Sequence, residues 1–144
     1  MLYTTKPENF NPKFIVVSAF LQHRGKILLL KRQNSKPEGN TWGMPAGKVD
    51  SKESIYDGVI REIREETGVD INRDDIEYFR EFFVRYPDYD FIYHIFSTRF
   101  DDKPEIIINR DEHKKFKWVE PEEALKLSLI QDLEGCIEAF YFSK

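Results

Sequence analysis

Apolar residues fall in short runs along the chain, and the period of each run predicts the element that it forms. The first two runs, residues 13–22 and 27–32, are rich in β-branched and aliphatic residues, and a turn that contains Gly25 separates them. This pattern predicts a hairpin of buried strands. Residues 33–43 have the composition of a loop.

A second, longer hairpin is predicted further along the chain. Two segments rich in Phe and Tyr, residues 75–86 and 91–100, flank the turn signal PDYD at 87–90. Two short strands, residues 105–108 and 115–119, are expected to follow it.

Between the two hairpins the hydrophobic period changes to that of a helix. Ser54 and Asp57 match a capping box, and Gly68 is a natural residue to end the helix. We therefore expect a helix from Ser54 to Thr67. One apolar stripe runs along it, formed by Tyr56, Val59, Ile60 and Ile63.

The C-terminal part of the chain predicts two more helices. Pro121 is suited to the first position of a short helix, and Ser128 with Gln131 offers a cap for a last helix. Strands in hairpins, with a helix between them and another at the end, indicate an α/β fold with a mixed sheet covered by helices.

Composition and charge narrow the functional classes. The chain has 144 residues, of which 40% are hydrophobic and 15% aromatic, so we expect a single domain over residues 1–144. A net charge of −4 argues against the broad basic surface needed to bind duplex nucleic acid.

The lone Cys136 cannot form an internal disulfide and is expected to pack in the core of a protein from a reducing compartment. We see no secretory signal, and the longest apolar run, residues 14–21, is too short to span a bilayer, so we expect a cytoplasmic protein with no membrane association.

Three glutamates at the end of the predicted central helix carry the candidate chemistry. Glu62, Glu65 and Glu66 occupy the last turn, where each carboxylate opposes the helix macrodipole at a cost of about 0.3 to 1 kcal/mol. Glu62 and Glu66 also repel each other on one face. The ordinary explanation is a solvated face paired with Arg61 and Arg64, but two arginines neutralise three clustered glutamates poorly. A divalent cation would compensate better, and oxygen ligands without His or Cys suit Mg²⁺ or Mn²⁺.

These glutamates are part of a longer pattern that resembles the Nudix (MutT-like) hydrolase family. The pattern is Gly-x5-Glu-x7-Arg-Glu-U-x-Glu-Glu-x-Gly-U, where U is aliphatic, and it is complete from Gly47 to Val69. The resemblance implies a Nudix-type α/β/α sandwich with a mixed β-sheet and a loop-helix-loop motif. It also implies a divalent-metal-dependent pyrophosphohydrolase that uses water to cleave a nucleoside diphosphate linked to another moiety. Homodimers are frequent in this family.

The resemblance also implies roles for individual residues. Glu62, Glu65 and Glu66 would hold Mg²⁺ or Mn²⁺, and one of the glutamates would help to activate water. Ala46 would offer a backbone carbonyl to the metal. Arg61 would orient the carboxylates, and Glu53 would brace the loop against the helix.

Candidates outside the motif have both a functional and an ordinary explanation. Glu112 is expected to be a further metal ligand or base, or else an acidic loop residue, and His113 beside it is expected to be a loop residue. Lys31 and Arg32 would bind substrate phosphate or simply end a strand in solvent. Tyr86 resembles a tyrosine of dinucleoside-polyphosphate hydrolases, but packing at a hairpin end explains it equally well.

The substrate stays open between nucleoside triphosphates, dinucleoside polyphosphates and nucleotide sugars. The alternative function is a catalytically weak Nudix-fold regulator that binds a nucleotide or metabolite. A Nudix-fold isomerase is disfavoured, because Cys136 lies outside any catalytic motif.

Overall fold

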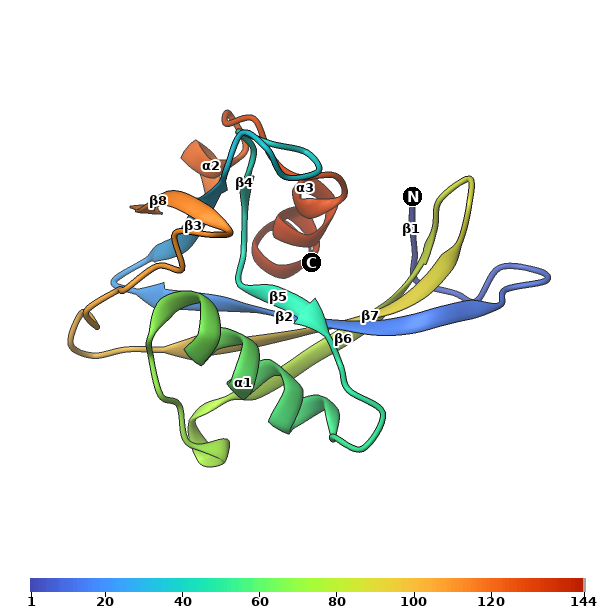
Figure 1. The fold of residues 1–144 in the computed structure, drawn as a ribbon, viewed down its shortest axis with the longest axis horizontal. Coiled ribbons are helices and arrows are strands. Elements are labelled where there is room, and N and C mark those ends of the chain that lie inside the picture. The colour runs from blue at the N-terminus through green and yellow to red at the C-terminus, as the bar shows by residue number, and fades with distance from the viewer. Residues whose placement is uncertain (144) are drawn as a thin grey trace.

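The computed structural model describes residues 1–143, and within them the strands form one mixed sheet (Figure 1). Its strand order is β1-β6-β7-β2-β3-β4, and β5 pairs with β2 while β8 pairs with β3. The pairing of β2 with β7 is parallel, and the other pairings of named strands are antiparallel. The strands are β1 (Leu2–Tyr3), β2 (Pro12–His23), β3 (Lys26–Arg32), β4 (Trp42–Gly43), β5 (Ala46–Lys48), β6 (Glu77–Arg85), β7 (Asp90–Arg99) and β8 (His113–Val119).

Helices lie on both faces of the sheet, with α1 on one side and α2 and α3 on the other (Figure 1). Their bounds are α1 (Ile55–Thr67), α2 (Pro121–Ala124) and α3 (Leu133–Ile137), with a 3₁₀ turn η1 (Arg73–Asp75) and a π-helical turn η2 (Glu138–Phe142). This is the layered α/β architecture that the sequence predicts. Within residues 1–143 no helix combines the length and the apolar character needed to cross a bilayer.

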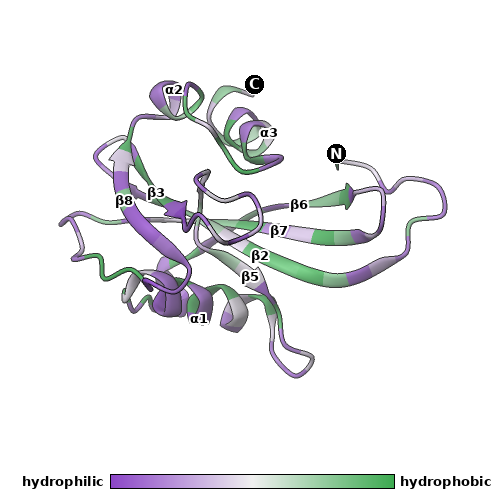
Figure 2. Cartoon of the chain, turned by 45° about the horizontal axis from the view of Figure 1, so that its top comes forward, coloured by the Kyte–Doolittle hydropathy of each residue, from purple (hydrophilic) through white to green (hydrophobic). Residues whose placement is uncertain are grey.

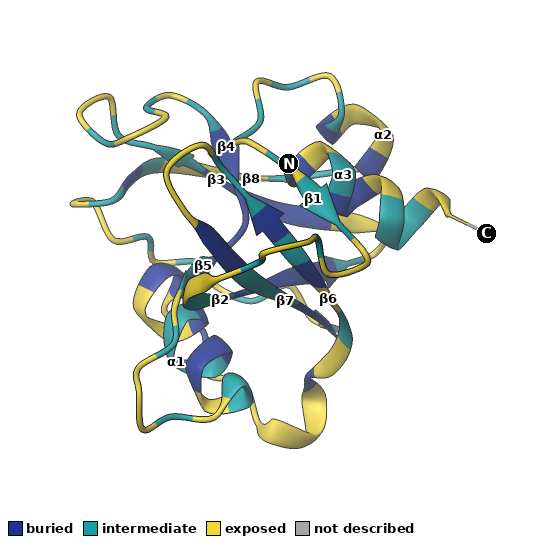
Figure 3. Cartoon of the chain, turned by 90° about the vertical axis from the view of Figure 1, so that its right-hand side faces the viewer, coloured by how far each residue is buried: buried dark blue, intermediate teal, exposed yellow. Residues whose placement is uncertain are grey.

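Each face of the sheet has its own hydrophobic cluster, because side chains alternate between the two faces along a strand. On β2, Val17, Ala19 and Leu21 pack with Val59 and Ile63 of α1. Phe20 points to the other face and joins the cluster that includes buried residues of α3. Green stretches along β2 in Figure 2 and buried stretches on the central strands in Figure 3 follow this two-sided core. Cys136 lies in the α3 cluster and is fully buried, as expected.

Most predicted elements are confirmed. Both hairpins form, α1 begins one residue after Ser54, and Pro121 is the first residue of α2. The prediction of a strand at 105–108 is wrong: this segment has no regular structure, although Ile106 and Ile108 pack against the α1 cluster. The predicted loop at 33–43 also contains the whole of the short strand β4 at its end.

The predicted cap of the last helix is wrong as well. The Ser128 carbonyl accepts a hydrogen bond from the Trp42 amide at 2.9 Å, and the Ile130 amide donates to the Trp42 carbonyl at 2.9 Å. This ladder to β4 holds residues 128–130 extended, so the helix begins at Leu133, after Asp132.

Candidate functional site

Two backbone features fix the ends of α1 and so position its last turn. The Asp57 amide donates to Ser54 Oγ at 3.0 Å at the N-terminus. At the other end Gly68 adopts φ 75°, a left-handed conformation that favours glycine, and its amide donates to the Arg64 carbonyl at 2.9 Å. The carboxylate of Glu62 lies beside Gly47 of β5, where a Cβ would overlap it. Glycine at 47 therefore lets the helix end approach the sheet.

Arg61 connects the carboxylates around this helix end. Its Nε and Nη2 donate to both oxygens of Glu53 at 2.8 and 2.9 Å, and its Nη1 donates to Glu62 at 2.7 Å and to Glu65 at 2.9 Å. The hydrogen bonds from Arg61 and from the Asp50 amide lower the pKa of Glu53 to about 2. Glu53 thus remains charged and ties the 50–53 loop to the helix.

Glu66 has a different environment. Its side chain is 11% exposed, against 51% for Glu65, and no arginine among residues 1–143 pairs with it. The Ala46 amide donates to its Oε2 at 3.2 Å. Burial and the neighbouring Glu62 raise the pKa of Glu66 well above its ordinary value. A positive charge placed beside it would reverse this effect.

His113 is the nearest imidazole to Glu66, and its predicted position in a loop is wrong. It is the first residue of β8, its side chain is 5% exposed, and its Nε2 lies 3.9 Å from Glu66 Oε1. Burial lowers the pKa of His113 to about 4, so the ring is neutral at pH 7. Its Nδ1 has no hydrogen-bond partner within residues 1–143. Lysine and aromatic residues alternate only over 115–118, so the local pattern does not extend the strand back to His113.

Two cavities meet at Glu66. A polar cleft of about 770 Å³ contains Arg61, Glu62, Glu65 and Glu66 together with Glu112. A narrower pocket of about 150 Å³ is lined by aromatic and polar side chains, among them Glu38, Tyr86, Tyr93, His113 and Gln131. Arg32, Ala46 and Glu66 line both cavities. The arrangement joins a carboxylate cleft to a pocket that can hold one planar ring.

The candidates outside the motif divide between the cavities and the surface. Glu112 lies in the cleft and pairs with Lys36 at 3.5 Å. Tyr86 lines the pocket and donates from its hydroxyl to Asp132 Oδ2 at 2.9 Å. Lys31 lines neither cavity. Sequence reasoning missed Glu38 and Gln131, because a long-range contact brings them to the pocket: the Gln131 amide donates to Glu38 Oε1 at 2.8 Å.

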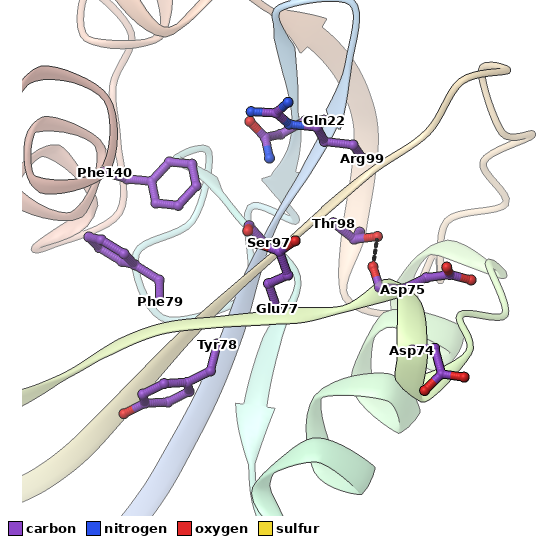
Figure 4. A pocket seen from close by; sticks show the side chains of 10 residues that line it. All are labelled: Gln22, Asp74, Asp75, Glu77, Tyr78, Phe79, Ser97, Thr98, Arg99 and Phe140. Atoms are coloured by element: carbon purple, nitrogen blue, oxygen red, sulfur yellow. Dashed lines mark hydrogen bonds between the residues drawn. The ribbon is translucent and has the colours of Figure 1, made fainter.

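A separate depression of about 540 Å³ lies where β6 begins and β7 ends, at the other end of this hairpin from Tyr86 (Figure 4). Asp74, Asp75 and Arg99 line it, and Thr98 Oγ1 donates to the Asp75 carbonyl at 2.6 Å. None of the glutamates of α1 lines it. We therefore place the candidate site at the cleft and pocket around Glu66.

The donor set around Glu66 fits a hard divalent cation in chemistry. Carboxylate and backbone carbonyl oxygens are the ligands that Mg²⁺ and Mn²⁺ prefer. Within residues 1–143, however, no three acidic, His or Cys side chains are already gathered closely enough to enclose an ion. Arg61 draws Glu62 and Glu65 toward itself, so these two carboxylates would have to reorient to share an ion with Glu66.

Comparisons with known proteins agree with this geometry. A family model described as the NUDIX domain matches residues 12–140. The chain is 31% identical over 127 residues to the CTP pyrophosphohydrolase of Escherichia coli, covering 87% of this chain and 89% of that protein. It is 33% identical over 78 residues to Nudix hydrolase 2 of Arabidopsis thaliana, which covers 54% of this chain but only 28% of that longer protein. The crystal structure of a MutT protein from Methanosarcina mazei superposes with a TM-score of 0.78 at 26% identity, covering 90% of this chain and 94% of that one.

Proposed function

Because the chain belongs to the NUDIX family, we propose that it is a divalent-metal-dependent pyrophosphohydrolase. Its substrate would be a nucleoside diphosphate linked to another moiety, cleaved by attack of water on phosphorus. The observation that carries the proposal is the meeting of two cavities at Glu66: a carboxylate cleft for metal and phosphates, and a pocket for one base.

The proposed metal ligands are the carboxylates of the cleft and one backbone group. They are Glu62, Glu65, Glu66 and Glu112, with the carbonyl of Ala46. When bound, Mg²⁺ or Mn²⁺ supplies charge neutralisation for the phosphates and lowers the pKa of the attacking water. The raised pKa of Glu66 supports its place in this set, since a buried carboxylate beside Glu62 lacks positive charge.

Arg61 and Glu53 are proposed to be positioning residues. The guanidinium holds two of the catalytic carboxylates and is itself held by both oxygens of Glu53. This bidentate contact fixes the plane of the guanidinium. Glu62 and Glu65 would then move only a short distance to exchange Arg61 for the metal when metal and substrate bind.

A nucleoside triphosphate is the substrate class that the pocket favours. Its volume of about 150 Å³ suits one nucleobase rather than two nucleosides. Tyr86 would contact the base, and Arg32, which lines both cavities, would bind phosphate between them. The name of the E. coli relative, CTP pyrophosphohydrolase, supports the same class.

The second candidate function is a nucleotide-binding regulator with little turnover. The pairing of Glu62 and Glu65 with Arg61, which leaves no gathered ligand set, favours it. Tight nucleotide binding without product release, over a panel of nucleotides with Mg²⁺ and with Mn²⁺, is the outcome that would select it.

Turnover of carboxylate variants tests the proposed hydrolase. Glu62→Gln and Glu66→Gln are each expected to lower turnover of the best substrate by at least about 100-fold, the usual scale for losing acid–base or charge stabilisation. Glu8→Gln changes an exposed glutamate near the N-terminus, outside the motif, and should leave turnover unchanged. Product identification by chromatography gives the bond that is cleaved. Near wild-type turnover in both cleft variants would reject the assignment.

A further inference from the structure

A row of side chains crosses three neighbouring strands on the face of the sheet that α2 and α3 cover. Lys31 of β3 is paired in register with Trp42 of β4 on one side and with Lys115 of β8 on the other. Lys117 lies two residues further along β8 and therefore projects to the same face. The Nζ atoms of Lys31, Lys115 and Lys117 lie 5.6, 5.9 and 5.1 Å from the centroid of the Trp42 ring. We call these three lysines and Trp42 the lysine–tryptophan cluster.

The three lysines of this cluster form no ion pair in the part of the chain that the structure describes, because none of their ammonium groups has a carboxylate there within ion-pairing distance. Lys31 and Lys115 stand directly opposite each other, and like charges at such a position destabilise a sheet. Partial burial and the neighbouring Lys115, Lys114 and Lys117 lower the pKa of Lys31. A chain with a net charge of −4 has thus gathered cations where they repel.

The cluster is separate from the site around Glu66. Arg32, the next residue of β3, lines both cavities of that site, whereas its neighbour Lys31 points to the opposite face and lines neither. Trp42, Lys115 and Lys117 do not line them either. The strand β8 that carries two of the lysines is largely hydrophilic (Figure 2). A ligand on the cluster would therefore sit behind β3 as seen from the cleft.

We propose that the lysine–tryptophan cluster is a second binding site, which takes a compact anion with two or three linked phosphates. Lysine ammonium groups bind phosphate as point charges, and three of them converge over one ring. The cation–π contacts to Trp42 hold these flexible side chains near each other before the anion arrives. An extended nucleic acid is disfavoured, because three lysines in one patch offer no path along which a backbone could run. The competing explanation is that the lysine stems only cover Trp42.

The site can be tested without turnover, in EDTA, because it needs no metal. Trp118→Phe leaves Trp42 as the sole tryptophan, since the chain has two. We expect its fluorescence to change saturably with pyrophosphate and with tripolyphosphate. The double variant Lys115→Gln/Lys117→Gln should raise the dissociation constant for these anions at least about 10-fold. The double variant Lys115→Arg/Lys117→Arg should keep the dissociation constant of the parent chain. If Trp118→Phe fails to fold, the indole resonance of Trp42 in the unchanged chain gives the same titration by NMR.

Two controls separate this site from the surface in general and from the cleft. Lys26→Gln removes an exposed lysine at the other end of β3 and should bind pyrophosphate like the parent chain. Glu66→Gln alters the cleft and should also leave this binding unchanged, whatever it does to turnover. Absence of a saturable signal, equal affinity in the double Gln variant, or tighter binding of a single-stranded oligonucleotide than of tripolyphosphate would each overturn the proposal. A nucleoside triphosphate that binds with the same affinity as tripolyphosphate would show that the site recognises the phosphates alone.

Discussion

Arg61 shows at the scale of one residue how a cluster of like charges is held in place. It donates to Glu53, Glu62 and Glu65 together, and a further hydrogen bond runs from its Nη2 to the Lys48 carbonyl at 3.1 Å. Only a planar guanidinium can serve these directions at the same time, because an ammonium group has three donors on a flexible stem.

The substitution Arg61→Lys keeps the charge and removes this geometry. We expect turnover to fall by about 10- to 100-fold, because the carboxylates lose their fixed positions. Unfolding in urea should show a loss of about 1 kcal/mol, since the bidentate contact with Glu53 is also lost. Arg64→Lys on the same helix is the matched control. Turnover and stability that both match those of the parent chain would contradict the role of Arg61.

The residues of the site differ in whether the sequence alone can predict that they lie together. The three glutamates follow from their spacing on one helix, and the roles of Arg61 and Glu53 are implied by the resemblance to the family pattern. His113 does not follow from spacing, since its place beside Glu66 depends on the pairing of its strand with Arg32, about 80 residues earlier in the chain. Local hydrophobic periods along a chain carry no information about such long-range pairings.

At the scale of elements, the two glycines with left-handed backbones differ in their surroundings. Gly25, in the β2–β3 turn, has φ 77° and open space where a side chain would begin. Gly68, at the end of α1, has φ 75°, and a Cβ there would lie 3.2 Å from the Cβ of Ile107. The segment around Ile107 is fixed to the helix end by a hydrogen bond from its amide to the Thr67 carbonyl at 2.8 Å.

This difference predicts an order of stabilities. Gly25→Ala should cost about 1 to 2 kcal/mol, which is the cost of a left-handed residue alone. Gly68→Ala should cost more than Gly25→Ala, because it also displaces Ile107. Denaturant midpoints of the two variants, measured with the parent chain, give the comparison. Equal losses would show that the contact with Ile107 does not restrain the helix end.

The β6–β7 hairpin carries an ion pair that makes its stability depend on pH. Arg85 donates to both oxygens of Asp90 at 2.9 and 3.1 Å, and the Asn11 amide donates to Asp90 Oδ2 at 2.8 Å. These bonds lower the pKa of Asp90 below its ordinary value of 3.8. A carboxyl group with a depressed pKa stabilises the folded state at pH values above its unfolded pKa, and this contribution is lost as the pH falls through the folded pKa.

Asp90→Asn should therefore be less stable than the parent chain near neutral pH. The difference should stay constant down to about pH 4.5 and then shrink as the pH falls below about 3.8. Urea titrations at several pH values test this, with Asp88→Asn, in the turn of the same hairpin, as the control. A difference that persists unchanged in acid would mean that Asp90 acts by packing and not by charge.

Prediction succeeded for elements whose own sequence determines their structure. It failed for segments whose structure depends on pairing with another part of the chain. Helix α1 has a cap, an apolar stripe and a terminating glycine, so its bounds follow from local signals. Residues 128–131 also look like a helix start, but their hydrogen bonds to Trp42 make them part of the sheet. The short strands β4 and β5 have two and three residues and no period of their own, so only their neighbours define them.

At the scale of the whole molecule, the site lies where the two layers on opposite faces of the sheet meet. The α1 layer supplies Glu62, Glu65 and Glu66, whereas Ile130 and Leu133 from the other layer line the pocket. Met44 and Ala46, around the passage from β4 to β5, connect the two. A chain that loses the packing of either layer would lose half of the site.

Metal binding should therefore be visible as stability of the whole fold. A ligand that binds only the folded state adds about 2.7 kcal/mol at about 100 times its dissociation constant, which raises Tm by several degrees. We expect Mn²⁺ or Mg²⁺ to raise the Tm of the parent chain measured by calorimetry, and EDTA to reverse the shift. The double variant Glu62→Gln/Glu66→Gln should show no shift. The single variant Glu66→Gln should also be at least as stable as the metal-free parent, because it removes a buried carboxylate that Arg61 does not contact. An equal shift in parent and double variant would place the ion elsewhere on the molecule and remove the basis for assigning the metal to α1.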